Sequence, residues 1–233
     1  MKIKIFVLIA FSLALSNLLF AQELTAKKMS EQAVLKENPE DAVKYIQSVI
    51  GNISVPAEKK AAYAFLGTLQ EAMALYADAQ KSYSIAAGIT AGNAEGMPKK
   101  SSERLVIDAV RCALSAGDYE NAKNWLNSAV RNSKSEEIQA TVKLYDQWCA
   151  LSGAETYEQT IEPVAMLKAY LEIPSMQIQK PAVLLTLWYI TGEKTYSQML
   201  ENEYPLSPET AIATGKAQIY PAPFWYFVPR KIE

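Results

Sequence analysis

The chain has 233 residues, of which 50% are hydrophobic and 21% charged, with a formal net charge of −2 and no His. Its 25 acidic and 23 basic residues include no basic block, which argues against nucleic-acid binding because clustered Lys and Arg supply most of that binding energy. The lack of His removes the usual general base, the common nucleophile pairs and the commonest zinc ligand, so the sequence favours a non-enzymatic protein.

The first 21 residues are predicted to be a secretory signal peptide. Lys2 and Lys4 precede an apolar run from Ile5 to Phe20, and the small residue Ala21 is followed at once by polar sequence. This pattern is typical of signal peptides. A membrane anchor is the alternative, because about 16 apolar residues approach the ~17–25 that span a bilayer.

Cleavage after Ala21 would remove two of the 23 basic residues and leave a mature chain with a net charge of −4. We expect this mature chain to be periplasmic or secreted, with no stable membrane span. No Cys stands at the cleavage site, so no lipid anchor is expected there.

Leu105–Val130 is predicted to form two short amphipathic helices joined by a tight turn at Gly117, Asp118 and Tyr119. Gly117 can end the first helix in a left-handed conformation, and Asp118 can cap the second. Apolar or small residues recur every three or four positions and therefore share one face of each helix. They are Val106, Ala109, Val110 and Ala113 before the turn, and Ala122, Leu126 and Ala129 after it.

Further helices are predicted on both sides of this unit. Asn38 and Pro39 have the residue types of an N-cap and a first helical position. Pro163 is expected in the first turn of another helix. The expected helices are 23–37, 39–51, two within 58–87, 138–151, 162–171, 181–191, 193–201 and a closing helix at 210–214.

The pair within 58–87 resembles the tetratricopeptide repeat, whose signature has an aromatic residue, Leu-Gly, Ala, an aromatic residue and Ala in that order. These are Tyr63, Leu66-Gly67, Ala79, Tyr83 and Ala86. The resemblance implies an all-α protein: a right-handed superhelical solenoid of antiparallel helix pairs, with about five degenerate units over residues 22–215.

The repeat spacing departs from the family's usual period of about 34 residues. Equivalent alanines stand at Ala42, Ala79 and Ala122, with intervals of 37 and 43 residues. The second interval contains the Gly-containing segment Gly88–Ser101, which we interpret as an extended loop between units.

The resemblance also implies a protein or peptide partner bound on the concave face. The residues expected to line this groove are Arg104, Ile107, Arg111, Lys143 and Gln147. Three cations there could hold a carboxylate of the partner; the alternative is a solvated face on which Asp108 pairs with Arg104 or Arg111. Under the first interpretation, Arg104→Glu with Arg111→Glu should leave the fold intact and abolish partner capture.

Residues 216–233 form a separate aromatic and Pro-rich tail. Phe224, Trp225, Tyr226 and Phe227 are four consecutive aromatic residues that should not be left in water. They are expected either to cover the end of the solenoid or to dock a partner.

Two further groups of residues each have two interpretations. Cys112 and Cys149 are either buried hydrophobic residues or a disulfide in an oxidising compartment. The aromatic residues Tyr145, Trp148, Trp188 and Tyr189 either belong to the core or line a ligand slot.

The sequence therefore favours a non-enzymatic periplasmic scaffold that mediates protein–protein interactions in the cell envelope, with no cofactor and no metal. One alternative is a small-molecule-binding accessory protein of a transport system, which requires an enclosed pocket. A less favoured alternative is a carboxylate-dependent glycan hydrolase, which requires two carboxylates about 5–9.5 Å apart across a cleft. No such pair stands out in the sequence.

Overall fold

The computed structural model describes residues 24–217 and 228–229. This part of the chain is all-α and contains no strand, as the sequence predicts. The predicted signal peptide at 1–21 and the tail aromatics Phe224–Phe227 lie outside the described residues. Within the described ranges, no helix has the length and apolar character needed to cross a membrane.

The α-helices are α2 (Ala26–Val34), α3 (Pro39–Val49), α4 (Pro56–Ala72), α5 (Tyr76–Gly88), α6 (Ser102–Ser115), α7 (Tyr119–Leu126), α8 (Glu136–Ser152), α9 (Tyr157–Tyr170), α10 (Lys180–Thr191), α11 (Lys194–Glu203) and α12 (Pro208–Ala213). Three short 3-10 helices follow α3, α7 and α9: η1 (Ile50–Asn52), η2 (Ala129–Asn132) and η3 (Pro174–Gln179).

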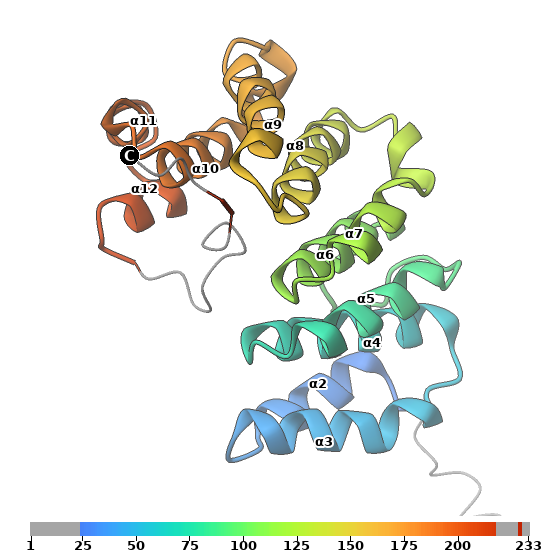
Figure 1. Ribbon diagram of the computed structural model, residues 1–233. Helices are drawn as coiled ribbons and strands as arrows, with labels where there is room; N and C mark the ends of the chain where they lie inside the picture. Colours follow the sequence, from blue (N-terminus) through green and yellow to red (C-terminus); the bar gives the residue numbers. More distant parts are fainter. Residues whose placement is uncertain (1–23, 218–227, 230–233) are drawn as a thin grey trace, which may run out of the picture.

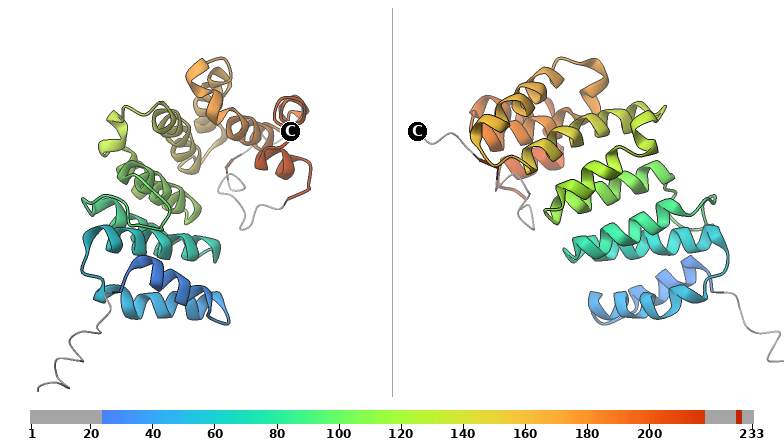
Figure 2. Two further views of the ribbon diagram at one scale, coloured as in Figure 1. Left: turned by 180° about the vertical axis from the view of Figure 1, so that it is seen from behind. Right: turned by 45° about the vertical axis from the view of Figure 1, so that its right-hand side comes forward.

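The helices pack in consecutive pairs: α2 with α3, α4 with α5, α6 with α7, α8 with α9, and α10 with α11. Neighbouring pairs contact each other through α2 and α4, α5 and α6, α6 and α8, and α9 and α10. Figures 1 and 2 show these pairs stacked in one row, which curves so that α10, α11 and α12 lie to one side of its N-terminal part.

Several helix ends form where the sequence predicts them. The Asn38 side chain accepts a hydrogen bond from the Asp41 N–H at 2.8 Å, and Pro39 is the first residue of α3. Asp118 caps α7 by accepting from the Asn121 N–H at 3.1 Å. Gly117 has φ +77°, so the turn before α7 requires the left-handed conformation that glycine adopts without strain.

The start of α9 differs from the prediction. We expected the helix to begin near residue 162 with Pro163 in its first turn, but it begins at Tyr157 and Pro163 lies inside it. A capping box explains the earlier start, because the Gln159 side chain accepts from the Thr156 N–H at 3.2 Å and Thr156 caps the Gln159 backbone. The helix continues through Pro163 although this residue cannot donate a main-chain hydrogen bond.

The predicted aromatic set belongs to the core. Tyr145 is 6% exposed, and its ring stacks on that of Trp148 with centroids 4.9 Å apart. The Trp148 indole N–H donates to the Thr186 hydroxyl at 3.1 Å, which joins α8 to α10. Trp188 and Tyr189 pack against the same core cluster in an edge-on pair. The set thus joins α8 to α10, in agreement with the core interpretation.

Cys112 and Cys149 are buried free thiols. Burial raises the pKa of each to about 12, and nearby carboxylates add to the effect. The structure therefore agrees with the interpretation that they are buried hydrophobic residues.

The segment between α5 and α6 contacts the helices at several points, although most of its residues are exposed. The Lys60 ammonium donates to the Ala91 carbonyl at 3.3 Å and to the Ser102 hydroxyl at 3.2 Å. Ala94 is 6% exposed, and the Ser30 hydroxyl lies 3.7 Å from the Met97 sulfur. These contacts hold residues 89–101 against α2, α4 and α6.

Beyond residue 217, the structure describes Val228 and Pro229. Val228 is 5% exposed and belongs to the core cluster built from α6–α12. Val228 therefore packs in this core cluster.

Candidate functional site

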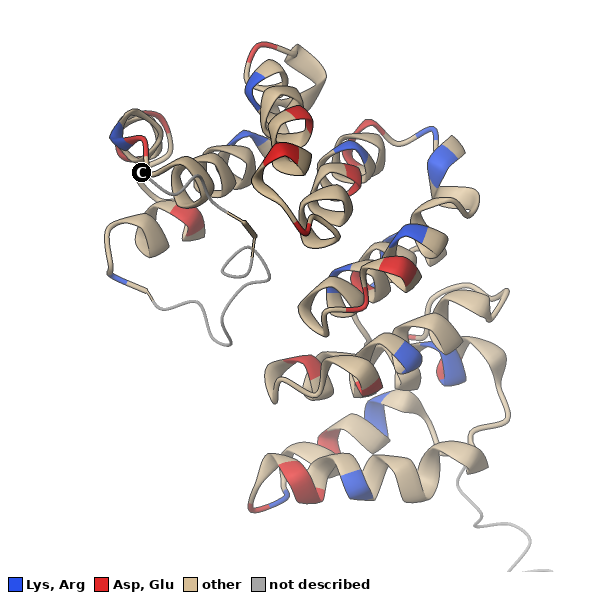
Figure 3. Ribbon diagram, in the orientation of Figure 1, with Lys and Arg blue, Asp and Glu red and all other residues tan. Residues whose placement is uncertain are grey.

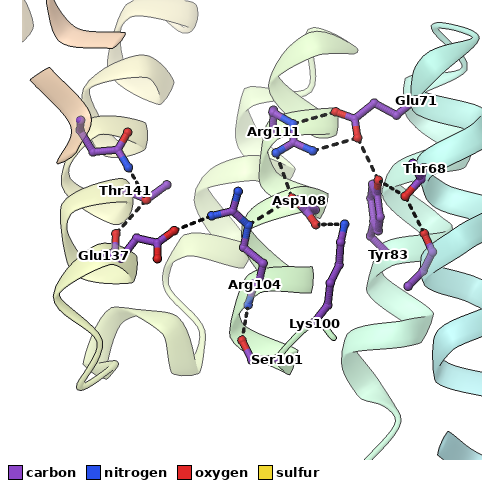
Figure 4. A network of polar contacts seen from close by, with 12 residues as sticks. Thr68, Glu71, Tyr83, Lys100, Ser101, Arg104, Asp108, Arg111, Glu137 and Thr141 are labelled. Carbon is purple, nitrogen blue, oxygen red and sulfur yellow. Dashed lines mark hydrogen bonds and ion pairs between the residues drawn. The ribbon is translucent and has the colours of Figure 1, made fainter. Parts of the chain in front are cut away.

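A network of charged side chains joins α4, α6, α8 and the segment before α6, and it contains two of the predicted groove residues (Figure 4). At its centre is Asp108 on α6, which is 2% exposed. Its carboxylate pairs with the Lys100 ammonium at 2.7 Å, with the Arg111 guanidinium at 2.9 Å and with Arg104 at 3.7 Å. A buried carboxylate needs such partners because its desolvation is otherwise costly.

Arg111 connects α6 to α4. Its guanidinium donates two hydrogen bonds to the Glu71 carboxylate, at 2.7 and 2.8 Å. Burial lowers the pKa of Arg111, but the hydrogen bonds that it donates to Glu71 and the charges of Asp108 and Glu71 outweigh this effect, and the net shift is upward. The Tyr83 hydroxyl also donates to Glu71 at 2.9 Å, and burial is the main cause of the raised pKa of Tyr83.

Arg104 extends the network to α8 by donating to Glu137 at 3.0 Å. The three cations Lys100, Arg104 and Arg111 are thus balanced by the three carboxylates Glu71, Asp108 and Glu137. The side chains of Arg104 and Arg111 hold helices together, as in the alternative interpretation with local ion pairs.

The other predicted groove residues do not gather around this network. Ile107 is 1% exposed, so its placement in the groove is corrected: it packs in the core on the buried face of α6. Gln147 donates to the Tyr170 hydroxyl at 3.2 Å and so connects α8 to α9. Lys143 is half-buried on α8, and within the described residues it forms no ion pair.

The expected effect of Arg104→Glu with Arg111→Glu is also corrected. A carboxylate at position 111 would face Glu71 and the buried Asp108, and Asp108 would lose most of its compensating charge. The double variant is therefore expected to destabilise the protein, so it does not isolate partner capture.

A separate groove of about 520 Å³ lies between α9, the C-terminal end of α10 and the start of α11. Two of its apolar side chains are strongly exposed: Ile161 at 53% and Tyr157 at 38%. At one end the Lys168 ammonium donates to the Glu193 carboxylate at 3.0 Å, and this hydrogen bond is the main cause of the raised pKa of Lys168. The remaining lining residues are Thr160, Val164, Ala165, Ile190, Thr191 and Gly192.

The sequence analysis did not identify this groove, because it predicted a start of α9 near residue 162, five residues after the observed start at Tyr157. With a helix start near 162, Tyr157 and Ile161 belong to a loop and cannot form a helix face. The signal that identifies the start is the capping pair of Thr156 and Gln159.

The groove differs from what the two alternative functions require. Its single carboxylate, Glu193, is paired with Lys168, so the groove lacks the two facing carboxylates of a glycan hydrolase. It is also open along α9, where Ile161 is exposed. In the residues that the structure describes, no three His, Cys, Asp or Glu side chains are grouped so as to hold a metal ion.

Parts of the chain are similar to known sequences. A family model, TP_0752_M, described as a middle domain, matches residues 152–233. An uncharacterized protein of Treponema pallidum (strain Nichols) is 29% identical over 133 residues, which are 54% of this chain and 34% of that protein. The chain thus spans about a third of the length of this relative. No solved structure matches the chain. The groove on α9 lies wholly inside the segment that the family model matches.

Proposed function

We propose that the chain is a non-catalytic scaffold of tetratricopeptide type that binds segments of other proteins in the cell envelope. The observation that carries this proposal is the curved row of helix pairs, in which each pair makes its main contacts with the neighbouring pairs. Such a row exposes a continuous surface crossing several helices, which suits the binding of extended or helical protein segments.

The close contact of α4 with α5 supports the tetratricopeptide assignment and a right-handed solenoid of about five units. A Cβ built on Gly67 would lie 2.9 Å from the Tyr83 ring, so the glycine lets this ring pack against α4. Ala79 and Ala86, on the same face of α5 as Tyr83, are fully buried. These are the positions at which the sequence resembles the repeat.

The proposed location is the periplasm or the outside of the cell. The sequence pattern of residues 1–21 supports it, with Lys2 and Lys4 before an apolar run and Ala21 at the expected cleavage site. N-terminal sequencing of the secreted protein tests this directly, and we expect Gln22 as its first residue.

Small-molecule binding is a second candidate function. The groove on α9 has about 520 Å³, within the ~300–1,000 Å³ usual for ligand pockets. The 53% exposure of Ile161 leaves one wall open, however, and an open apolar wall suits a protein segment better than a small molecule.

Crosslinking in cells that produce the full chain tests the scaffold function. After crosslinking, the protein is isolated under denaturing conditions and the attached proteins are identified by mass spectrometry. We expect one or a few envelope proteins in near-stoichiometric amounts. Capture of only abundant bystanders, in amounts equal to those attached to an unrelated exported protein, would contradict the proposal.

A further inference from the structure

The groove between α9, α10 and α11 combines an apolar floor with an acidic rim. Tyr157, Ile161 and Val164 supply apolar surface from α9, and Ile190 closes the floor from α10. Glu158 and Glu162 each follow a groove residue by one position, so they stand about 100° further around the same helix. Figure 3 shows acidic positions along α9.

The carboxylates beside the groove on α9 form no ion pair with any residue that the structure describes. Within the described ranges, no ion pair involves Glu155, Glu158 or Glu162, and all three are exposed. Residues 152–217 include eight acidic residues and four basic residues. Two of these basic residues, Lys168 and Lys180, are already paired with Glu193 and Glu203. Beside the groove, α9 therefore carries two exposed carboxylates, Glu158 and Glu162, that no ion pair among the described residues neutralises.

We propose that this groove binds a partner protein segment in which a large apolar side chain stands next to Lys or Arg. The apolar side chain would cover Tyr157 and Ile161, and the cations would lie along Glu158 and Glu162. Charge complementarity selects this partner chemistry, because an acidic segment would be repelled by the same rim. The inference rests on the proposed scaffold function and adds a binding site and a class of partner to it.

Binding of a defined peptide to the full mature chain tests the proposal. The probe is a fluorescent peptide of twelve residues with Leu at every third or fourth position and Lys elsewhere. One control peptide carries Glu in place of Lys, and another carries Ser in place of Leu. Fluorescence anisotropy should show saturable binding of the Leu–Lys peptide and affinities at least about tenfold weaker for both controls.

Variants of the protein assign the binding to the groove. Ile161→Asp removes an exposed apolar contact, and Glu158→Lys with Glu162→Lys reverses the charge of the rim. Each variant should bind the Leu–Lys peptide with an affinity about tenfold lower than that of the parent protein. The matched control is Glu31→Lys with Glu201→Lys, which makes the same change in net charge at exposed positions outside the groove lining. It should leave the affinity within about twofold of the parent.

Three results would overturn the proposal. If the rim and control variants weaken binding equally, the peptide recognises net charge and not the groove. If light scattering shows a dimer that Ile161→Asp dissociates, a second copy of the chain occupies the groove. If Phe224→Ser with Trp225→Ser strengthens peptide binding, the chain's own tail occupies it.

The outcome is separable from that of the scaffold function. Peptide binding is measured on purified protein, whereas the scaffold function is tested by capture in cells. If the Ile161→Asp variant captures the same envelope proteins as the parent, the scaffold survives and the groove assignment fails. If the groove binds the peptide but no protein is captured in cells, the scaffold function fails and the peptide site remains.

Discussion

Asp108 shows how one buried charge is maintained by its neighbours. Its carboxylate is almost completely removed from water, and Lys100, Arg104 and Arg111 surround it. The same arginines connect α6 to Glu71 on α4 and to Glu137 on α8. We therefore assign to this network the role of fixing three helices relative to one another, in place of the partner binding expected from the sequence.

Asp108→Ala should lower the free energy of unfolding by about 3–5 kcal/mol, because it leaves the partly buried cations without their shared carboxylate. Glu137→Ala is the matched control, since its side chain is 53% exposed and an exposed pair contributes less than about 1 kcal/mol. Urea unfolding followed by circular dichroism measures both. Similar losses for the two variants would contradict the structural role of Asp108.

Gly67→Ala should destabilise the contact between α4 and α5 by about 1–3 kcal/mol, because the added methyl group would overlap the buried Tyr83 ring. Gly51→Ala provides the control, as a Cβ there meets nothing within 4 Å. Thermal unfolding should distinguish the two. An unchanged melting temperature for Gly67→Ala would show that Tyr83 can move aside at little cost.

The buried thiols predict a loss of stability at alkaline pH. Each thiol has an ordinary pKa of 9.0, raised in the folded protein to about 12. Between these values the unfolded chain releases protons that the folded chain retains, so the stabilising contribution is complete below pH 9 and disappears as pH rises toward 12.

Replacing Cys112 and Cys149 by Ala should make the stability curve flatter between pH 9 and 12, although the variant is less stable at neutral pH because of the lost side-chain volume. The measurement is the free energy of unfolding by urea at several pH values. Identical slopes for parent and variant would show that the thiols do not contribute to this pH dependence.

At the scale of the elements, the residues at helix ends predicted where helices begin better than the residues in helix interiors did. Asn38 with Pro39, and Gly117 with Asp118, allowed two helix starts to be predicted from short-range chemistry alone. The predicted start of α9 near residue 162 was wrong, because Pro163 is typical of a first helical turn whereas the capping pair of Thr156 and Gln159 starts the helix at Tyr157. Local signals compete, and their relative strength depends on side-chain contacts that a sequence does not display.

The candidate site was less predictable than the helices. One of the two interpretations drawn from the sequence paired Asp108 with Arg104 or Arg111, and the structure contains both pairs. This pairing could be predicted because the three residues lie on one helix, with Arg104 and Arg111 seven positions apart. Glu71 lies 40 residues before Arg111, so its part in the network depends on how the repeat units stack. The groove on α9 likewise combines residues from α9, from α10 and from the Gly192–Glu193 linker, and no spacing within one helix reveals it.

The segment between α5 and α6 should behave as a fixed part of the structure. Ala94→Asp would bury a charge beneath it and release residues 89–101, so amide hydrogen exchange in this segment should increase while α8 stays protected. Asn93→Asp adds the same charge at the exposed neighbouring position and should change little. Equal exchange in both variants would show that the segment is not held by Ala94.

At the scale of the whole molecule, the row of helix pairs presents two different surfaces. The face that contains Arg104 and Arg111 is electrically balanced and stabilises the stacking of the helices. The groove on α9 is apolar and bordered by unpaired carboxylates, and it lies in the segment matched by the family model. This contrast moves the proposed binding site from the middle of the row to its C-terminal part.

Site-specific photocrosslinking in cells tests the central claim, that the protein binds segments of other proteins, most directly. A photoreactive residue is placed at Ile161 in the groove, at Lys143 on α8 and, as a control, at the exposed Glu37. We predict discrete adducts with one or a few envelope proteins at position 161, and none at position 37. The same background of adducts at all three positions would contradict the account.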